Sequence, residues 1–195
     1  MKMKAIICIF SAVMLFLTSA TYSAKPGSRD PRQYFFTLSF GNLPEEMRIA
    51  REEGKQGMLL FFEADDCVYC QRMLSQVFNQ RAVQDWYGER FISIAVDVFG
   101  DIELTDFDGK IVPSKVFSDQ QKVFGTPVVS FLDLNGIEIY RHFGMIGTPQ
   151  EFLLLGEYIA DKHYEDTEFE DFLSSKGRTV GGEVLVTPSH FGKME

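Results

Sequence analysis

The sequence predicts an α/β fold in which a mixed central sheet is covered by helices on both faces. Strand-like apolar segments alternate with helix-like segments between residues 43 and 123, and strands separated by helices imply parallel pairing. The Asn135-Gly136 turn then joins two further strands as a hairpin, which adds antiparallel pairs. An apolar run at residues 58–62 fits a strand buried on both faces, as the centre of a helix-covered sheet requires.

A helix is expected before that central strand. Asn42 is suited to cap it, Pro44 stands in its first turn, and Glu45 and Glu46 place negative charge at its positive end. Gly54 is suited to end it, because glycine readily adopts the left-handed conformation that follows many helices.

The segments after the central strand continue the alternation. Residues 67–70 lie where the end of that strand meets the start of another helix. In chain order we then expect a short helix at 82–87, a strand at 91–98, an insertion between residues 98 and 113 with an Asp108-Gly109 turn, a helix at 114–123, and strands at 128–132 and 137–142. Thr148 and Glu151 form a capping box around Pro149, and the helix that it opens is expected to run to about Lys162.

The first 24 residues have the order of a secretory signal peptide. Lys2 and Lys4 give a positive start, residues 5–17 are apolar, and small or polar residues follow up to Ala24. The apolar run is shorter than the roughly 20 residues that a membrane span needs. A retained membrane anchor is the alternative. Cys8 lies inside the apolar run instead of at its end, so it does not fit a lipid-attachment cysteine.

The chain is therefore expected to have four parts. These are a signal peptide at 1–24, a linker or N-terminal extension at 25–42, the folded domain at 43–164, and a C-terminal extension at 165–195 that is partly disordered and holds a short helix. Within the second part, the aromatic residues 34–40 fit either a first strand or an irregular packed segment, and the sequence does not decide between them.

Charge and cysteine count limit what the exported chain binds. Removal of residues 1–24 takes away Lys2 and Lys4 and no acid, so the net charge changes from −9 to −11. Such a charge argues against nucleic acid and anionic membrane surfaces as partners and favours a soluble protein, which we expect to be a monomer. Two cysteines remain, Cys67 and Cys70, which are too few for a structural disulfide framework.

Cys67 and Cys70 form a Cys-x-x-Cys pair at a predicted helix N-terminus. Unpaired backbone N–H groups and the helix dipole stabilise an anion there, so the first cysteine loses its proton readily and its thiolate attacks. The second cysteine lies one turn along, close enough to displace the resulting mixed disulfide. The pattern predicts a thiol–disulfide oxidoreductase with Cys67 as nucleophile and Cys70 as resolving thiol. No cofactor is expected besides the redox-active disulfide itself.

Three other uses of the cysteine pair fit less well. A structural zinc site needs four ligands, and the sequence offers neither a second cysteine pair nor ligand-spaced histidines, so no metal is expected. Covalent haem attachment needs a histidine after Cys70, where Gln71 stands. An inert structural disulfide that closes so small a loop would contribute little stability.

Pro127 supplies the second feature of the predicted site. A proline that begins a buried strand cannot donate to the sheet there, although an ordinary trans-proline at a strand start would fit the same pattern. Together with the strand–Cys-x-x-Cys–helix unit, Thr126-Pro127 resembles the thioredoxin superfamily over roughly residues 43–162. The resemblance implies a thioredoxin fold, a cis-proline loop against the cysteines, and substrate binding by strand addition beside it. Val68 and Tyr69, between the cysteines, complete the predicted substrate-binding set with Thr126 and Pro127.

More narrowly, the chain resembles exported thioredoxin-like proteins of the SoxW type. The matching features are Phe61-Phe62-Glu63, Asp65-Asp66-Cys67-Val68-Tyr69-Cys70-Gln71-Arg72-Met73, the insertion after Asp97, and Gly125-Thr126-Pro127. Where thioredoxin has a buried aspartate beneath the site, this chain has Phe61, which leaves the proton acceptor for Cys70 open. Glu63 is the nearest candidate by sequence, and a solvated charge at the strand end is the other interpretation of it.

The direction of exchange depends on how strongly the attacking thiolate is stabilised. Asp65 and Asp66 put negative charge beside Cys67, which disfavours its thiolate and favours a reductant, although salt screens charges that point into solvent. The resemblance implies a periplasmic reductant of disulfides in exported partner proteins, recharged by a membrane electron carrier.

Two kinds of alternative stay open. The first is an exported isomerase or oxidase of the Dsb kind. Tyr69 before Cys70 and Thr126 before Pro127 are both seen in exported disulfide isomerases, but those proteins carry a dimerisation domain for which residues 25–42 are too few. A non-catalytic binding module on the same fold, or a Cu(I) chaperone with two thiolate ligands, would belong to a different class of function.

Overall fold

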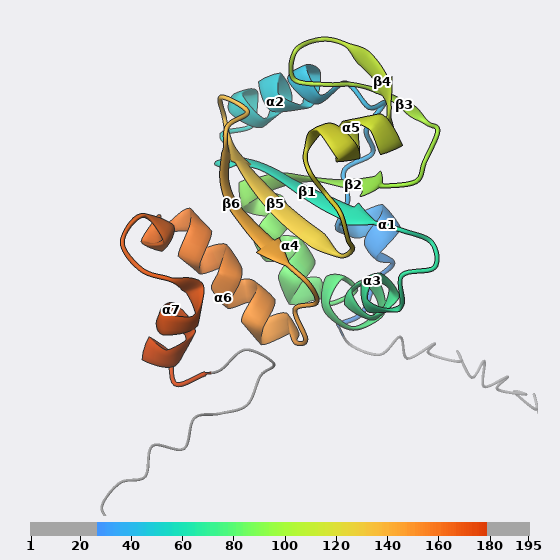
Figure 1. The fold of residues 1–195 in the computed structure, drawn as a ribbon. Helices are drawn as coiled ribbons and strands as arrows, with labels where there is room; N and C mark the ends of the chain where they lie inside the picture. The colour runs from blue at the N-terminus through green and yellow to red at the C-terminus, as the bar shows by residue number, and fades with distance from the viewer. Residues whose placement is uncertain (1–26, 179–195) are drawn as a thin grey trace, which may run out of the picture.

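The computed structural model describes residues 27–178 (Figure 1), so the predicted signal peptide and the end of the predicted C-terminal extension lie outside the described residues. The strands are β1 (Gly57–Glu63), β2 (Phe91–Asp97), β3 (Glu103–Thr105), β4 (Ile111–Pro113), β5 (Val128–Asp133) and β6 (Glu138–Phe143). The helices are α1 (Pro31–Tyr34), α2 (Leu43–Glu52), α3 (Val68–Met73), the π-helical turn η1 (Leu74–Phe78), α4 (Arg81–Arg90), α5 (Ser114–Gln120), α6 (Pro149–Ala160), the 3₁₀ turn η2 (His163–Glu165) and α7 (Phe169–Ser175).

The main sheet has four strands in the order β2-β1-β5-β6. β1 pairs with β2 in parallel and with β5 antiparallel, and β5 pairs antiparallel with β6. This arrangement confirms the predicted mixed sheet. The register places Val128 opposite Phe62, so Glu63 at the end of β1 and Pro127 just before β5 lie at the same end of the sheet.

Helices cover both faces of the sheet, as predicted (Figure 1). Side chains alternate between the two faces along β1, because successive residues of a strand point in opposite directions. Met58, Leu60 and Phe62 pack with α2 and α5 in one core cluster. Leu59 and Phe61 pack with α3, η1, α4, α6 and α7 in the other, and the cysteines lie on that second face.

The aromatic segment before α2 is an irregular packed segment that follows a helical turn. Asp30 caps α1, and Phe35 and Phe36 are then buried in the core cluster that contains α3. The Phe35 ring stacks on Phe78 at 4.3 Å between centroids. The segment joins the edge of β2 by a hydrogen bond of 2.8 Å from the Thr37 N–H to the Ser93 carbonyl. Residues 35 and 36 are therefore part of the same core as residues 43–164.

The insertion after β2 is a hairpin of the short strands β3 and β4, which confirms the predicted Asp108-Gly109 turn. Gly109 has φ +79°, a left-handed conformation that glycine adopts without strain. The Asp106 carboxylate accepts hydrogen bonds from the Asp108 and Lys110 N–H groups and so holds the turn.

The predicted helix caps at Asn42 and Thr148 are confirmed, and each side chain accepts a hydrogen bond of 3.1 Å from the N–H three residues on. The helix expected at 114–123 is wrong at its end, because the chain leaves the helix at Gln120 and turns through the left-handed Lys122. Lys162 is likewise left-handed and lies after the end of α6.

The short helix expected in the C-terminal extension is α7, which buries Phe169, Phe172 and Leu173. Within residues 27–178, the helices all fall short of the length and apolar character that crossing a membrane requires.

Candidate active site

Cys67 and Cys70 lie where β1 gives way to α3, and a disulfide bond joins them. Cys67 is the N-cap residue of α3, and its Sγ accepts a hydrogen bond of 3.1 Å from the Cys70 N–H. Cys67 is partly exposed, whereas Cys70 is fully buried. The first cysteine is therefore the one that a partner protein can reach.

The loop between β1 and α3 is a tight turn held by backbone hydrogen bonds. The Cys67 N–H donates to the Ala64 carbonyl and the Gln71 N–H donates to the Cys67 carbonyl, both at 3.1 Å. Asp65 and Asp66 are exposed. Their negative charges lie close to Cys67 along the chain but in contact with water, where salt screens them.

The surroundings of Cys70 are apolar. It belongs to the core cluster that includes Phe61, Met73 and Val129. Phe61 stands on β1 in this cluster, so this position of the strand beneath α3 offers no acid. A thiol in apolar surroundings keeps its proton, and reduced Cys70 therefore needs a base before it becomes a nucleophile.

Glu63 is a buried ion-pair partner and not a solvated charge. Its two carboxylate oxygens accept hydrogen bonds from the two terminal nitrogens of Arg32, Nη1 to Oε1 and Nη2 to Oε2, the second at 2.8 Å. These hydrogen bonds raise the pKa of the Arg32 guanidinium, against the opposing effect of burial. The sequence indicated Glu63 but not its partner. A buried acid requires a positively charged partner, and the sequence alone does not show which basic residue the fold brings next to it.

Thr126 and Pro127 lie at the same end of the sheet as the cysteine loop. The peptide bond between them is cis. Pro127 is buried, Thr126 is half-buried, and the Pro127 carbonyl accepts a hydrogen bond of 2.9 Å from the Gly144 N–H. By register, Pro127 comes next to Glu63 across the β1–β5 pair, so the proline loop and the cysteine loop are neighbours.

Apolar side chains are exposed around these two loops. Val68 is 62% exposed and Tyr69 is 54% exposed. Phe99 and Phe124, which sequence reasoning missed, are exposed and line a cavity of about 260 Å³ that also includes Thr126. The available signal was the position of Phe124 just before Gly125-Thr126-Pro127. Phe99 and Phe124 therefore lie beside Thr126 of the proline loop.

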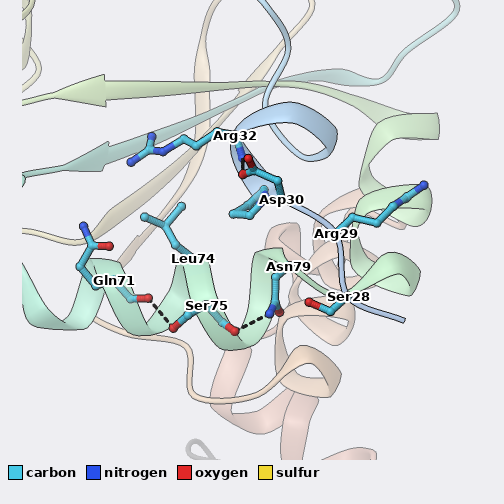
Figure 2. Close-up of a pocket in the computed structure, with 9 residues that line it drawn as sticks. Ser28, Arg29, Asp30, Arg32, Gln71, Leu74, Ser75 and Asn79 are labelled. Atoms are coloured by element: carbon cyan, nitrogen blue, oxygen red, sulfur yellow. Dashed lines mark hydrogen bonds between the residues drawn. The ribbon is translucent and has the colours of Figure 1, made fainter. Parts of the chain in front are cut away.

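A second pocket, of about 500 Å³, lies against α3 and η1 (Figure 2). It is formed between the segment that leads into α1 and the helical face that carries Gln71 and Leu74. Figure 2 shows Arg32 reaching over Leu74, while Arg29 points in the opposite direction.

Metal-ligating side chains do not gather in the described part of the chain. Within residues 27–178, no three histidine, cysteine, aspartate or glutamate side chains come together in a way that could hold a metal ion.

The segment that contains this site is similar in sequence and fold to known proteins. A family model described as "Thioredoxin-like domain" matches residues 43–160. The chain is 27% identical to a thioredoxin-fold protein from Helicobacter pylori, with a TM-score of 0.48, over 63% of this chain and 80% of that one. It is 25% identical to a thioredoxin from Thermus thermophilus, also with a TM-score of 0.48, over 62% of this chain and 85% of that one.

A putative disulphide-isomerase from Bacteroides thetaiotaomicron is 21% identical, with a TM-score of 0.48, over 68% of this chain and 93% of that one. No curated protein sequence matches the chain. The family match contains both cysteines, Glu63 and Pro127, whereas Arg32 lies before its first residue.

Proposed function

The chain belongs to the thioredoxin-like domain family, and from that premise we propose that it is an exported reductant of disulfide bonds in partner proteins. The fold and the Cys67–Cys70 pair point to thiol–disulfide oxidoreductase activity. The observation that carries the proposal is the difference between the two cysteines, of which Cys67 is partly exposed at a helix start and Cys70 is buried behind it.

The reaction follows from that difference. In the reduced protein the Cys67 thiolate attacks a partner disulfide, forms a mixed disulfide and releases one partner thiolate. The Cys70 N–H, which already points at the Cys67 sulfur, is placed to stabilise that thiolate. Cys70 then attacks Cys67, the internal disulfide forms, and the second partner thiolate leaves. Two electrons pass from the dithiol to the partner disulfide.

Reduction is the favoured direction because little stabilises the Cys67 thiolate beyond the helix start. The charges nearest to it in sequence, Asp65 and Asp66, are negative, and their exposure weakens but does not reverse their effect. A strong oxidant would need a reduced form that is much more stable. Return of the disulfide to the dithiol would then fall to a membrane electron carrier.

Substrate binding is proposed at the proline loop. An extended partner chain would pair with the backbone beside Thr126 and Pro127, in the manner of an added strand. The exposed side chains of Val68, Tyr69 and Phe124 border that path and suit apolar residues next to the partner's disulfide.

The direct test is catalysed reduction of insulin by the purified protein with dithiothreitol as electron source, compared with the Cys67→Ser and Cys70→Ser variants. We expect the first variant to be inactive and the second to stop as a mixed disulfide that denaturing electrophoresis without reductant reveals. Faster rescue of scrambled ribonuclease than reduction of insulin would favour the isomerase. Stoichiometric copper retained after purification would favour a Cu(I) chaperone. A protein that reacts with no disulfide would instead be a non-catalytic binding module.

Export is a separate proposal with its own test. Residues 1–24 lie outside the described structure, and their sequence is that of a signal peptide. We expect mass spectrometry of the protein from its native membrane-enclosed compartment to show a new N-terminus near residue 21 or 25. A chain that keeps Met1 and sediments with membranes would support the retained anchor.

A further inference from the structure

A groove of about 480 Å³ lies along the outer edge of β2, away from the cysteines and the proline loop. The sheet order is β2-β1-β5-β6, so β2 has a neighbouring strand of this sheet on one side only. The groove is lined by residues 36–41 after α1, residues 94–97 of β2 and residues 102–104 of the insertion. Residues 36–41 precede the segment that the family model matches, so the groove is formed in part by this chain's own N-terminal extension.

The outer edge of β2 is hydrogen-bonded at Ser93 and open at Ala95. The Ser93 carbonyl accepts its hydrogen bond from Thr37, which lies outside the sheet. Just after β2, the Val98 N–H donates to the Glu63 carbonyl of β1 at 2.9 Å. Because the backbone groups of alternate residues point to opposite neighbours, those of Ala95 point away from β1, like those of Ser93. Among residues 27–178, none forms a backbone hydrogen bond with Ala95 on that side, so a donor and an acceptor are open to an added strand.

Three large apolar side chains line the groove and are left exposed by the fold. Leu38 is 89% exposed, Phe40 is 96% exposed and Ile102 is 83% exposed. We call these three residues the apolar wall. Single exposed apolar residues are common on protein surfaces, but several of them around one groove are typical of a surface that contacts another protein.

The charge of the groove is negative. Arg32 and Glu63 line it, but they neutralise each other in their ion pair. Asp97 and Glu103 line it as well, and both are exposed. Neither forms an ion pair with another residue in the described part of the chain, and we call these two residues the acidic pair. The acidic pair and the net charge of −9 of the whole chain both favour a partner of positive charge.

We propose that this groove binds an extended segment of a partner protein, one that contains apolar and basic residues, as an additional strand on the edge of β2. The backbone of the segment exchanges hydrogen bonds with Ala95, its apolar side chains lie against the apolar wall, and a lysine or arginine faces the acidic pair. The binding uses no thiol and a different surface from the proline loop, so the inference goes beyond the proposed function.

The test is a fluorescence anisotropy titration of the purified protein with labelled octapeptides that contain no cysteine. In one peptide lysine alternates with valine, in the second glutamate alternates with valine, and in the third lysine alternates with serine. We expect the lysine–valine peptide to bind at least about tenfold more tightly than either of the others, because only this peptide matches both the apolar wall and the acidic pair.

Variants of the groove locate the binding. Ala95→Pro removes the outward N–H and keeps the pairing of β2 with β1, because an edge strand tolerates proline where its N–H faces away from the sheet. We expect it to weaken binding of the lysine–valine peptide by about fivefold. Asp97→Asn combined with Glu103→Gln removes the acidic pair and should weaken binding by about fivefold. If Ala95→Pro unfolds, as circular dichroism would show, the acidic-pair variant still decides the question.

A matched pair of exposed isoleucines controls for the loss of apolar surface. Ile102→Ser changes the apolar wall and should weaken binding by about threefold or more. Ile137 is 62% exposed just before β6 and does not line the groove, so Ile137→Ser should leave binding unchanged.

The inference is overturned if the three peptides bind equally or not at all, if the groove variants bind the lysine–valine peptide as tightly as the wild type, or if Ile137→Ser weakens binding as much as Ile102→Ser. Size-exclusion chromatography adds one more outcome. A dimer that Ala95→Pro converts to a monomer would assign the groove to a second copy of this chain and so overturn the proposal. Reduction of insulin is measured separately, so the loss of this inference leaves the proposed function standing.

Discussion

The two faces of the sheet are built differently. The face that carries the cysteines is packed with aromatic rings. The Phe78 ring, for example, has four ring neighbours with centroids 4.3 to 5.8 Å away, which are Phe35, Phe36, Phe61 and Phe152. On the other face, Phe117 is equally buried, but its ring neighbours Phe62 and Phe107 lie 6.2 and 6.3 Å away.

The difference shows what each face supports. On the aromatic face, Phe35 and Phe36, which follow α1, belong to the same core cluster as Cys70 and Met73 of α3. The opposite face anchors α2 and α5 through a largely aliphatic cluster that contains neither cysteine. A defect in the first face should therefore reach the redox site, and a defect in the second should cost only stability.

The largest expected effect is that of Phe78→Ala. Loss of a ring with four close neighbours should lower the free energy of unfolding by about 3–5 kcal/mol. The reduced protein should release the coloured thiol of dithiobis(nitrobenzoic acid), a small disulfide, once through Cys67 and once through Cys70. Because Phe35 and Phe36, which follow α1, pack against this ring, the second release from dithiobis(nitrobenzoic acid) should slow as well. Urea unfolding and stopped-flow absorbance of the two releases measure the two effects.

The matched change on the other face is Phe117→Ala. We expect a loss of about 3 kcal/mol, at the low end for a buried phenylalanine, because its ring contacts are looser and the seven-residue helix α5 can relax. Both release rates should stay at their wild-type values. A Phe117→Ala protein that slows the second release as much as Phe78→Ala would remove the distinction between the faces.

A smaller effect is expected for Tyr87→Phe within the aromatic face. The buried Tyr87 hydroxyl donates a hydrogen bond of 2.6 Å to the Phe152 carbonyl on α6. Its loss should lower the free energy of unfolding by about 1–2 kcal/mol, with the ring stack on Phe152 kept. No change in urea midpoint would mean that this polar contact contributes nothing to holding α4 on α6.

The smallest effect concerns pH. Burial lowers the pKa of His142 on β6, against the opposing charge of Glu170, so the folded protein favours neutral imidazole. Below an unfolded-state pKa of about 6.5 the unfolded chain binds a proton that the folded chain binds less readily, so stability falls as pH drops through this range. His142→Gln should flatten the dependence of the urea midpoint on pH between about 7 and 5. An unchanged slope would show that other groups cause it.

Most of the domain was predictable because its signals are local. The apolar run of β1, the cap at Asn42 and the Asn135-Gly136 turn each act within a few residues, and all are confirmed. The end of α5 was not, because the turn through Lys122 has no glycine to mark it.

Contacts between segments that are far apart in the chain could not be predicted from the sequence. Phe35 and Phe36 pack on rings from distant segments, such as Phe78, more than 40 residues later, so the sequence left strand and irregular segment equally open. Glu63 stood out as an acid beside the cysteine motif, but its pairing with Arg32 depends on where α1 packs. The exposed Phe99 and Phe124 meet at the proline loop for the same reason.

The central claim is reversible dithiol–disulfide exchange at Cys67 and Cys70 in the reducing direction. Its most direct test is the reduction potential of the pair, measured by equilibrating the purified protein with glutathione or dithiothreitol buffers and trapping free thiols. The account predicts a value near that of thioredoxin, about −270 mV. A value near about −120 mV would contradict the direction and indicate an oxidant, and a pair that never cycles would contradict the oxidoreductase itself.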